Sequence, residues 1–484
     1  MNKTESISLK KKLISGTLWL TGLTFSGQAF TWIVSIFVIR LLEPEDYGLM
    51  AMAGFFVGFL ALWRELGLSP AVIQKKDISN VELKRVFGCV ILLNILFVLL
   101  IFTLAPLAAM FFSEPKIVPI LRALSINFPL TALYFLPQAL LKRNLEFKKK
   151  SFIDLLANIF ASFVLLTLAY LGYGVWSLVL SLVSMNIFKA IAFNTQRKYC
   201  YWPSFELSGM RHFMLFGGHI TLTRSLWHLY SQADILIAGR FLGKDILGIY
   251  TIAMRVASLP IDKLSAIFTQ IGLSAFARIQ SDLSAVQNSF LQLVKITNIF
   301  SFPLFIGLAL VAPDLIPLVL GDTWLKVIYP LQILCIIMPL RFVTILYPPI
   351  ITGIGRPEII TKNMIIAIIL MPAAFLYGSQ WGLLGMCFAW VTAFPVLFLI
   401  MTHRVLNALE ISGMQLFKTF LQPAFSCLFM SLVLLLIEWY IGGGAPVMVS
   451  LLVKIIAGAI SYATILVLLN KTIISEIKSF FVDR

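Results

Sequence analysis

Long apolar runs dominate this chain, and short polar or glycine-containing stretches separate them. A helix that crosses a membrane needs about 20 predominantly apolar residues. The run VFGCVILLNILFVLLIFTLAPLAAMFF, which begins at Val86, exceeds that length without a charge. The pattern predicts an all-α integral membrane protein with fourteen spanning helices, near 13–38, 47–66, 86–112, 117–141, 151–171, 175–195, 213–239, 246–271, 294–320, 327–352, 359–377, 382–402, 418–440 and 447–470.

The composition agrees with this prediction. Of the 484 residues 60% are hydrophobic and 12% are charged, whereas soluble domains have about 45–50% apolar and about 25% charged residues. The basic amino terminus resembles a secretory signal, but the apolar stretch after it is too long and has no small-residue cleavage site. We therefore expect it to be retained as the first span. The five cysteines have no metal-ligand or redox spacing, and we expect them to be small core residues.

The basic residues are concentrated in alternate loops, which predicts the orientation. If the amino terminus is cytoplasmic, the inner segments hold about 25 Lys and Arg and the outer loops about six, as the positive-inside rule requires. Both termini are therefore predicted to be cytoplasmic, and topology accounts for the net charge of +16 without nucleic acid as a partner. The mixed segment 67–85 is either an amphipathic helix along the inner surface or an ordinary loop.

Two stretches resemble each other at an offset of 200 positions: RLLEPEDYG at 40–48 and RFLGKDILG at 240–248. The likeness continues from GLSPAVIQKKD at 67–77 to GLSAFARIQSD at 272–282. An even number of spans in each repeat gives both halves the same orientation, as in transporters with a central cleft between two lobes. The predicted units are an N-lobe at 1–205, a C-lobe at 206–405 and a C-terminal helix pair at 406–484. Gly48 and Gly248 are expected to let the chain turn tightly into the next helix.

Several motifs resemble a known family. ISGTLWL at 14–20, VIRLLEPEDYGLMAMA at 38–53, ELGLSPAVIQKKDIS at 65–79, LLKRNLEFKKK at 140–150 and AFARIQSD at 275–282 are similar to the polysaccharide transporter family of the multidrug/oligosaccharidyl-lipid/polysaccharide (MOP) exporter superfamily, in particular its colanic-acid-type flippases. The resemblance implies a MATE-like transporter fold and alternating access. It also implies an undecaprenyl-diphosphate-linked glycan as substrate, moved from the inner to the outer leaflet of the bacterial cytoplasmic membrane. Membrane lipids and polysaccharide polymerase or assembly proteins are the further partners to expect.

Ionisable residues inside the predicted spans are candidate binding residues, because a charge at membrane depth is costly and usually faces a cavity or a partner. Arginine matches phosphate geometry through its fork of donors. The residues predicted to contact the anionic head group are Arg224, Arg255, Arg341, Arg122 and Lys263. The alternative is internal ion pairing, for instance of Arg255 with Asp262 or of Arg224 with Asp234.

Polar residues at helical spacing predict the lining of a cleft. Arg224, His228 and Gln232 recur every four residues and share one helix face. The residues predicted to line the cleft are Thr24, Gln28, His228, Gln232 and Ser258.

Uphill transport of a charged glycan requires an ion gradient, of H⁺ or Na⁺, or the membrane potential. A buried carboxylate whose pKa is raised by desolvation can take up a proton, and the candidates are Asp154, Asp234 and Asp262. The sequence has no metal-ligand set, phosphate loop or nucleophile elbow. We therefore expect no metal, no cofactor and no catalytic activity.

Three other functions are weighed against the flippase. A multidrug or cation antiporter of the same superfamily would need an acidic, aromatic cavity, but the deep charges here include more Arg and Lys than Asp. A membrane glycosyltransferase or polymerase would normally have a large outer domain with catalytic acids, and the predicted outer loops are short. A purely structural partner in an assembly complex is disfavoured by the repeated transporter layout.

Overall fold

The computed structural model describes residues 27–28, 30–75, 77–195, 201–206, 211–441 and 446–471, which form helices and turns without any strand. The predicted all-helical membrane fold is thereby confirmed. Ten segments among these residues are long and apolar enough to cross a membrane. The chain forms two compact units, called here unit 1 (Met1–Gly248) and unit 2 (Ile249–Arg484).

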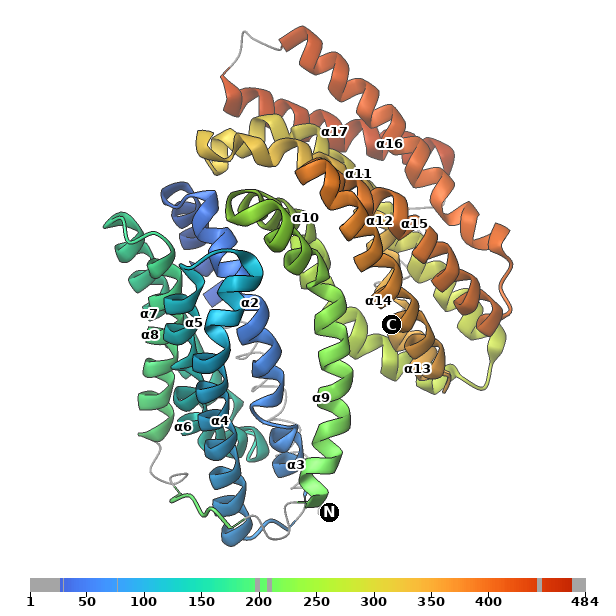
Figure 1. Cartoon of the computed structure of the whole chain (residues 1–484). Coiled ribbons are helices and arrows are strands. Elements are labelled where there is room, and N and C mark those ends of the chain that lie inside the picture. The colour runs from blue at the N-terminus through green and yellow to red at the C-terminus, as the bar shows by residue number, and fades with distance from the viewer. Residues whose placement is uncertain are drawn as a thin grey trace. The chain divides into compact units, whose positions relative to one another are not determined.

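Unit 1 is built from helices that pack along their lengths in pairs (Figure 1). After a short apolar helix at Phe30–Leu41, it contains α2 (Pro44–Trp63), α3 (Leu68–Gln74), α4 (Asn80–Phe112), α5 (Ile117–Ser125), α6 (Asn127–Arg143), α7 (Phe147–Tyr170), α8 (Val175–Asn194), α9 (Arg211–Ser231) and the first part of α10 (Ala233–Ile279). α4 packs against α5 and α6, and α8 packs against α6 and α7. The buried core of unit 1 lies mainly between α4, α6 and α8.

Unit 2 is centred on the long helix α11. Its elements after α10 are α11 (Leu283–Val319), η2 (Asp322–Val327), α12 (Ile328–Thr344), α13 (Tyr347–Gly353), α14 (Glu358–Gly378), η3 (Ser379–Trp381), α15 (Gly382–Leu409), α16 (Gly413–Ile441) and α17 (Val447–Leu469). α11 packs against α12, α16 and α17, while α15 packs against α12 and α14.

The helices follow the predicted spans. The first span lies largely outside the described residues; the seventh covers α9 and the start of α10, and the eighth lies in the rest of α10. α10 bends at Gly243 (φ 79°, ψ 178°), where the sequence predicted a turn between these two spans. The fourteen-helix count stays a prediction, as do the lobes at 1–205 and 206–405, which follow the repeat and not the division at Gly248.

The segment 67–85 is helical at both of its ends, and its placement along the inner surface stays a prediction. α3 is a seven-residue helix that buries Leu68 and Val72, and a turn follows it. α4 then begins at a capping box, in which Ser79 Oγ accepts from the Glu82 amide at 3.2 Å and Glu82 Oε2 accepts from the Ser79 amide at 3.0 Å. This reciprocal pair satisfies two of the amide donors that every helix start exposes.

The repeated glycines mark a crossing of two helices and not a turn, so the predicted turning role was wrong. A Cβ atom on Gly48 would lie 1.8 Å from the Lys244 carbonyl oxygen, and one on Gly248 would lie 1.8 Å from the Pro44 carbonyl oxygen. The two contacts are equivalent at the offset of 200, since 48 corresponds to 248 and 44 to 244. We call this reciprocal contact the Gly48–Gly248 crossing. It requires glycine because any side chain would overlap the opposing backbone.

Ion pairs surround the crossing at what we call the Glu45 end of unit 1. Lys244 Nζ lies 2.8 Å from Glu45 Oε1 and 3.0 Å from Glu114 Oε2. Lys116 Nζ lies 2.6 Å from Glu45 Oε1. Nearby, Arg240 donates to Ser113 Oγ at 2.9 Å. The two lysines and two glutamates of this network balance in charge.

The C-terminal helix pair, α16 and α17, is docked on α11. A buried core cluster includes Ile299, Met430 and Tyr462, and Tyr462 donates to the Ile299 carbonyl at 2.8 Å. Lys454 is the single charged residue of α17; it pairs with Asp314 at 2.5 Å and also with Glu438. These contacts attach the pair to unit 2 through both apolar and ionic groups.

The described cysteines are buried and free, as predicted for core residues. They are Cys89, Cys335, Cys387 and Cys427, while Cys200 lies outside the described residues.

Candidate functional site

Arg341, near the end of α12 in unit 2, contacts sulfur atoms and an aromatic ring. Its NH1 atom lies 3.3 Å from Met254 Sδ and 3.7 Å from Met338 Sδ. The guanidinium carbon stands 4.4 Å from the centroid of the Trp390 ring. No ion pair joins it to any described residue of the chain. Thioether sulfur is a weak acceptor, so the donors of Arg341 remain suited to an anion.

The platform beneath Arg341 is fixed. Trp390 Nε1 donates to the Tyr250 hydroxyl at 2.8 Å, and the indole packs against Phe375 and Phe394. Trp390 is itself buried. A cation held over a rigid indole ring keeps its charge and its direction, which favours recognition of a phosphate or carboxylate.

Two predicted residues meet at Met254, because Ser258 also donates to Met254 Sδ, at 3.6 Å. Arg255 is exposed, and the predicted alternative pair with Asp262 is not formed. The side chain of Lys263 lies outside the described residues. Unit 2 thus brings Arg341 and Ser258 together and leaves Arg255 without a hydrogen bond or ion pair to the described residues.

The predicted polar face of α9 in unit 1 divides into a packed and an exposed part. His228 Nε2 donates to the Phe55 carbonyl at 3.1 Å, and its ring packs against Phe55 and Phe59. Arg224 is exposed and does not form the alternative pair with Asp234. His228 therefore ties α9 to α2, whereas Arg224 remains accessible.

The remaining predicted residues differ in their surroundings. Gln28 is exposed and Gln232 partly exposed, while Thr24 lies outside the described residues. Arg122 is exposed, with its guanidinium carbon 5.4 Å from the Phe102 ring centroid. Asp234 is buried and accepts from the Ile235 amide at 2.8 Å, and Asp262 is exposed.

Asp154 has two lysine partners that the sequence analysis did not single out. Lys150 Nζ lies 2.6 Å from Asp154 Oδ2, and Lys189 Nζ lies 3.2 Å from Oδ1. Lys150 is one helical turn before Asp154 on α7, a spacing visible in the sequence. Lys189 comes from α8, and only the packing of α7 on α8 brings it close.

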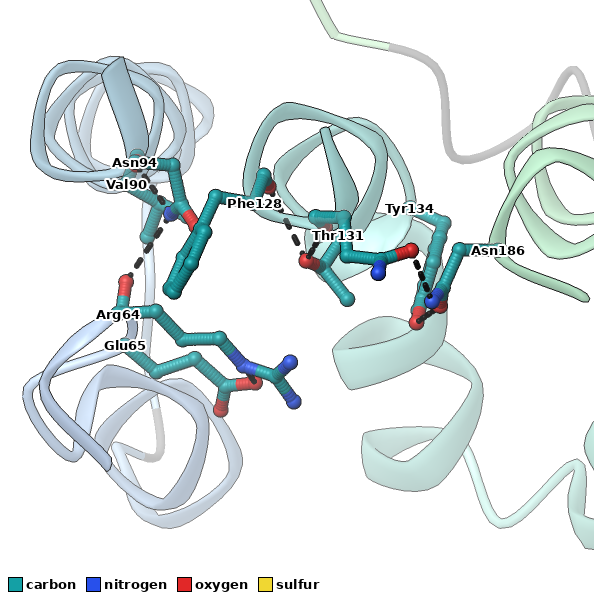
Figure 2. A network of polar contacts seen from close by, with 9 residues as sticks. Arg64, Glu65, Val90, Asn94, Phe128, Thr131, Tyr134 and Asn186 are labelled. Atoms are coloured by element: carbon teal, nitrogen blue, oxygen red, sulfur yellow. Dashed lines mark hydrogen bonds and ion pairs between the residues drawn. The ribbon is translucent and has the colours of Figure 1, made fainter. Parts of the chain in front are cut away.

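Sequence analysis also missed a neutral polar network inside unit 1 (Figure 2). Tyr134 donates to Asn186 Oδ1 at 2.9 Å, and Asn186 Nδ2 donates to Asn127 Oδ1 at 2.9 Å. Tyr134 and Asn186 are buried, as is Asn94 on α4. An asparagine within an apolar run was the available signal, since a buried amide needs partners.

Asn94 positions the end of α2. Its Nδ2 donates to the Arg64 carbonyl at 3.1 Å and to the Val90 carbonyl at 2.7 Å. The chain then turns through Leu66 and Gly67, which have φ values of 41° and 66°. Figure 2 shows Arg64 and Glu65 beside this network. Asn94 therefore anchors the backbone of a charged corner.

Comparison with known proteins shows the family. The model of the family described as polysaccharide biosynthesis protein matches residues 37–329, more than half of the chain. The chain belongs to this family, and the predicted membership in the polysaccharide transporter family of the MOP superfamily is confirmed.

Similar proteins cover most of the chain. The lipopolysaccharide biosynthesis protein WzxC of Escherichia coli is 26% identical over 78% of this chain and 78% of its own length. The teichuronic acid biosynthesis protein TuaB of Bacillus subtilis is 24% identical over 73% of each chain. The succinoglycan biosynthesis transport protein ExoT of Rhizobium meliloti is 21% identical over 90% of this chain and 89% of its own.

Solved structures show the same fold. The lipid II flippase MurJ, in an inward closed conformation, matches with a TM-score of 0.73 and 15% identity over 94% of this chain and 100% of its own. An inward-facing MATE transporter of the MOP superfamily matches with a TM-score of 0.60 and 19% identity over 78% and 95%. The protein is thus a multi-pass membrane transporter and not an enzyme, which sets the glycosyltransferase alternative aside.

Proposed function

We propose that this protein is a flippase. It moves an undecaprenyl-diphosphate-linked oligosaccharide from the inner to the outer leaflet of the bacterial cytoplasmic membrane by alternating access. The observation that carries the proposal is membership in the polysaccharide biosynthesis family along residues 37–329. Relatives named for lipopolysaccharide, teichuronic acid and succinoglycan biosynthesis support a glycan as cargo. A fold shared with a lipid II flippase supports a lipid carrier.

Arg341 is the proposed contact with the anionic head. A guanidinium without a carboxylate offers parallel N–H donors to phosphate oxygens, and the bidentate arrangement adds both strength and direction. Arg224 and Arg255, exposed on α9 and α10, are proposed as further contacts within their own units. The protein forms and breaks no covalent bond, because the cargo changes sides and not chemistry.

Both termini are proposed to be cytoplasmic on the charge pattern of the loops, and exposed aromatic residues mark the ends of several predicted spans. Tyr and Trp gather where apolar chain meets the aqueous interface. Seven strongly exposed examples lie at helix ends that the charge pattern assigns to the outer side: Tyr170, Tyr173, Tyr329, Tyr377, Trp381, Trp439 and Tyr440. Coupling to an H⁺ or Na⁺ gradient or to the membrane potential, and docking to a polymerase, belong to the same proposal.

The test is transfer of a labelled undecaprenyl-diphosphate oligosaccharide across proteoliposome membranes, under imposed gradients and voltage. Arg341→Ala should slow transfer about tenfold or more, since a hydrogen bond to a charged group contributes about 1.5–3 kcal/mol. The transfer rate of Arg341→Lys should lie between those of the native protein and Arg341→Ala, because lysine keeps the charge but lacks the paired N–H donors of arginine. Arg356→Ala, an exposed arginine in the turn before α14, is the matched control.

Each outcome decides a different part of the proposal. If Arg341→Ala, Arg224→Ala and Arg255→Ala all transfer the substrate at the native rate, the protein is still a flippase but the proposed contacts are wrong. No transfer of the lipid-linked glycan under any gradient, together with export of organic cations, would replace the flippase by the antiporter.

A further inference from the structure

Positive charge is in excess at the end of unit 1 where Asp154 lies. Asp154 is held between Lys150 and Lys189, at 2.6 and 3.2 Å, and the side chains of these lysines are only 20% and 15% exposed. One carboxylate therefore neutralises two partly buried ammonium groups incompletely.

A third lysine adds to this excess. Lys142, at the end of α6, is partly buried and lies within electrostatic reach of Lys150, Glu65 and Asp154. It forms no ion pair or hydrogen bond with the described residues. Burial and the nearby Lys150 disfavour the charged form of Lys142, and Glu65 and Asp154 offset only part of that cost.

Tyr134 connects these lysines to the corner at the end of α2. Its hydroxyl lies within electrostatic reach of Arg64, Asp154 and Glu65, and its hydrogen bond to Asn186 fixes its direction. Arg64 Nε is buried without a hydrogen-bond partner among the described residues, and the nearest carboxylate oxygen, Glu65 Oε1, is 3.6 Å away. A buried donor in this state is suited to an acceptor that the chain does not supply.

We infer that this group of side chains, the Asp154 cluster, is a binding site for a diphosphate or a doubly charged phosphate ester. Its members are Arg64, Lys142, Lys150, Lys189, Glu65 and Asp154. Four cations and two carboxylates leave an excess of two positive charges, which matches a dianion. The donors come from α6, α7, α8 and the residue that follows α2, and a phosphate group can accept hydrogen bonds from several directions.

This inference rests on the proposed function and gives the location where the substrate is first bound. The cluster lies at the helix ends that the charge pattern assigns to the cytoplasmic side. A lipid-linked diphosphate would meet it there before any movement of the molecule. A free diphosphate, such as the inorganic ion, has the same charge and oxygen geometry and would use the same donors.

Binding is measured on the full-length protein, by titration calorimetry with inorganic diphosphate in detergent and with a short-chain polyprenyl diphosphate in nanodiscs. Lys142→Gln and Lys189→Gln should each weaken binding about tenfold, the loss of one charge-assisted contact. Lys189→Arg should restore most of the affinity. Lys148→Gln, an exposed lysine on the same helix as Lys150, should bind as the native protein does.

Asp154→Asn should change the affinity for diphosphate in the opposite direction. Removing this carboxylate releases two lysines and raises the local charge, so binding should tighten about threefold. A merely structural Asp154 would weaken binding or leave it unchanged. Lys142→Gln covers the case in which Asp154→Asn does not fold, because Lys142 forms no ion pair with the residues that the structure describes.

The two titrations distinguish a lipid-linked diphosphate from a free diphosphate as the ligand. Lipid-linked diphosphate that binds at least tenfold more tightly than the inorganic ion would identify the lipid head, and equal affinities would identify the free anion. Native protein that binds neither, or lysine variants that bind both as well as the native protein, would overturn the inference. Transfer of lipid-linked glycan would still proceed in that case if the proposed function is right, whereas binding without transfer would leave the inference and remove the function.

Discussion

The two ends of unit 1 use the same kinds of side chain with a different charge balance. At the Glu45 end, Lys244 lies between the carboxylates of Glu45 and Glu114. In the Asp154 cluster, one carboxylate lies between two lysines. The first arrangement is completed by Lys116 and is neutral, whereas the second carries an excess of positive charge. Charge balance thus distinguishes a contact that holds the chain together from one that is fitted to a ligand.

The backbone differs in the same sense. At the Glu45 end, the Gly48–Gly248 crossing brings two helices together without intervening side chains. Hydrogen bonds to Glu45 and Glu114 raise the pKa of the Lys244 ammonium, which keeps this lysine charged throughout the physiological pH range. We therefore regard the Glu45 end as a structural contact and the Asp154 end as a site that can bind an anion.

Substitution at the crossing should have the largest effect. Gly48→Ala places a methyl group against the Lys244 carbonyl oxygen, so the helices must separate. We expect unfolding in detergent to become easier by about 3 kcal/mol, at the upper end of the usual cost of overpacking. The measurement is thermal unfolding of the purified protein.

Gly54→Ala is the matched control for Gly48→Ala. Gly54 lies on the same helix, and a Cβ there would meet nothing within 4 Å. Its unfolding temperature should not fall, because alanine favours helix more than glycine does. Equal destabilisation by both changes would show that the crossing is not the cause.

Removing one cation at each end should give different results. Lys244→Met leaves Glu114 without its lysine and next to Glu45, and we expect a loss of about 1 kcal/mol, the upper value for ion pairs near a surface. Lys142→Met removes an excess charge, so stability should stay the same or rise. Thermal unfolding at low and high salt checks both, since screening should reduce the difference. A larger loss in Lys142→Met would reverse the comparison.

The neutral network should matter for stability about as much as the Lys244 ion pairs and not at all for the ligand. Tyr134→Phe leaves Asn186 Oδ1 without its buried donor, at a cost of about 1 kcal/mol. Affinity for diphosphate should be unchanged, because no charge is lost. Tyr329→Phe, a strongly exposed tyrosine at the start of α12, should change neither property. Diphosphate affinity that falls with Tyr134→Phe would make the tyrosine part of the site.

Much of the fold could be predicted from the chain because hydropathy is a local property. The run after Val86 became α4, and the turn between the seventh and eighth spans is the bend at Gly243. The repeat pointed to Gly48 and Gly248, but their role was misjudged, since the sequence does not show which backbone approaches a glycine. Their contact depends on the crossing of two helices far apart in the chain.

Single charged residues of the site could be predicted, because a charge inside an apolar helix stands out in the sequence. Their partners could not. Arg341 was selected as a charge inside an apolar helix, and the structure adds Trp390 and Met254 as its neighbours. Asp154 was selected as a lone carboxylate, yet Lys189 reaches it from another helix. Pairing cannot be read from spacing once the partners belong to different helices.

The sequence by itself determined that this chain lies in a membrane, which segments are apolar enough to cross it, and which family it resembles. Those properties sum over neighbouring residues, so no tertiary contact is needed to establish them. The tertiary structure decided which charges meet, and therefore that Lys244 closes one end of unit 1 while Lys142 stays without an ionic partner among the described residues. The physical reason is that an ion pair depends on a few ångströms between side chains, a distance that helix packing sets.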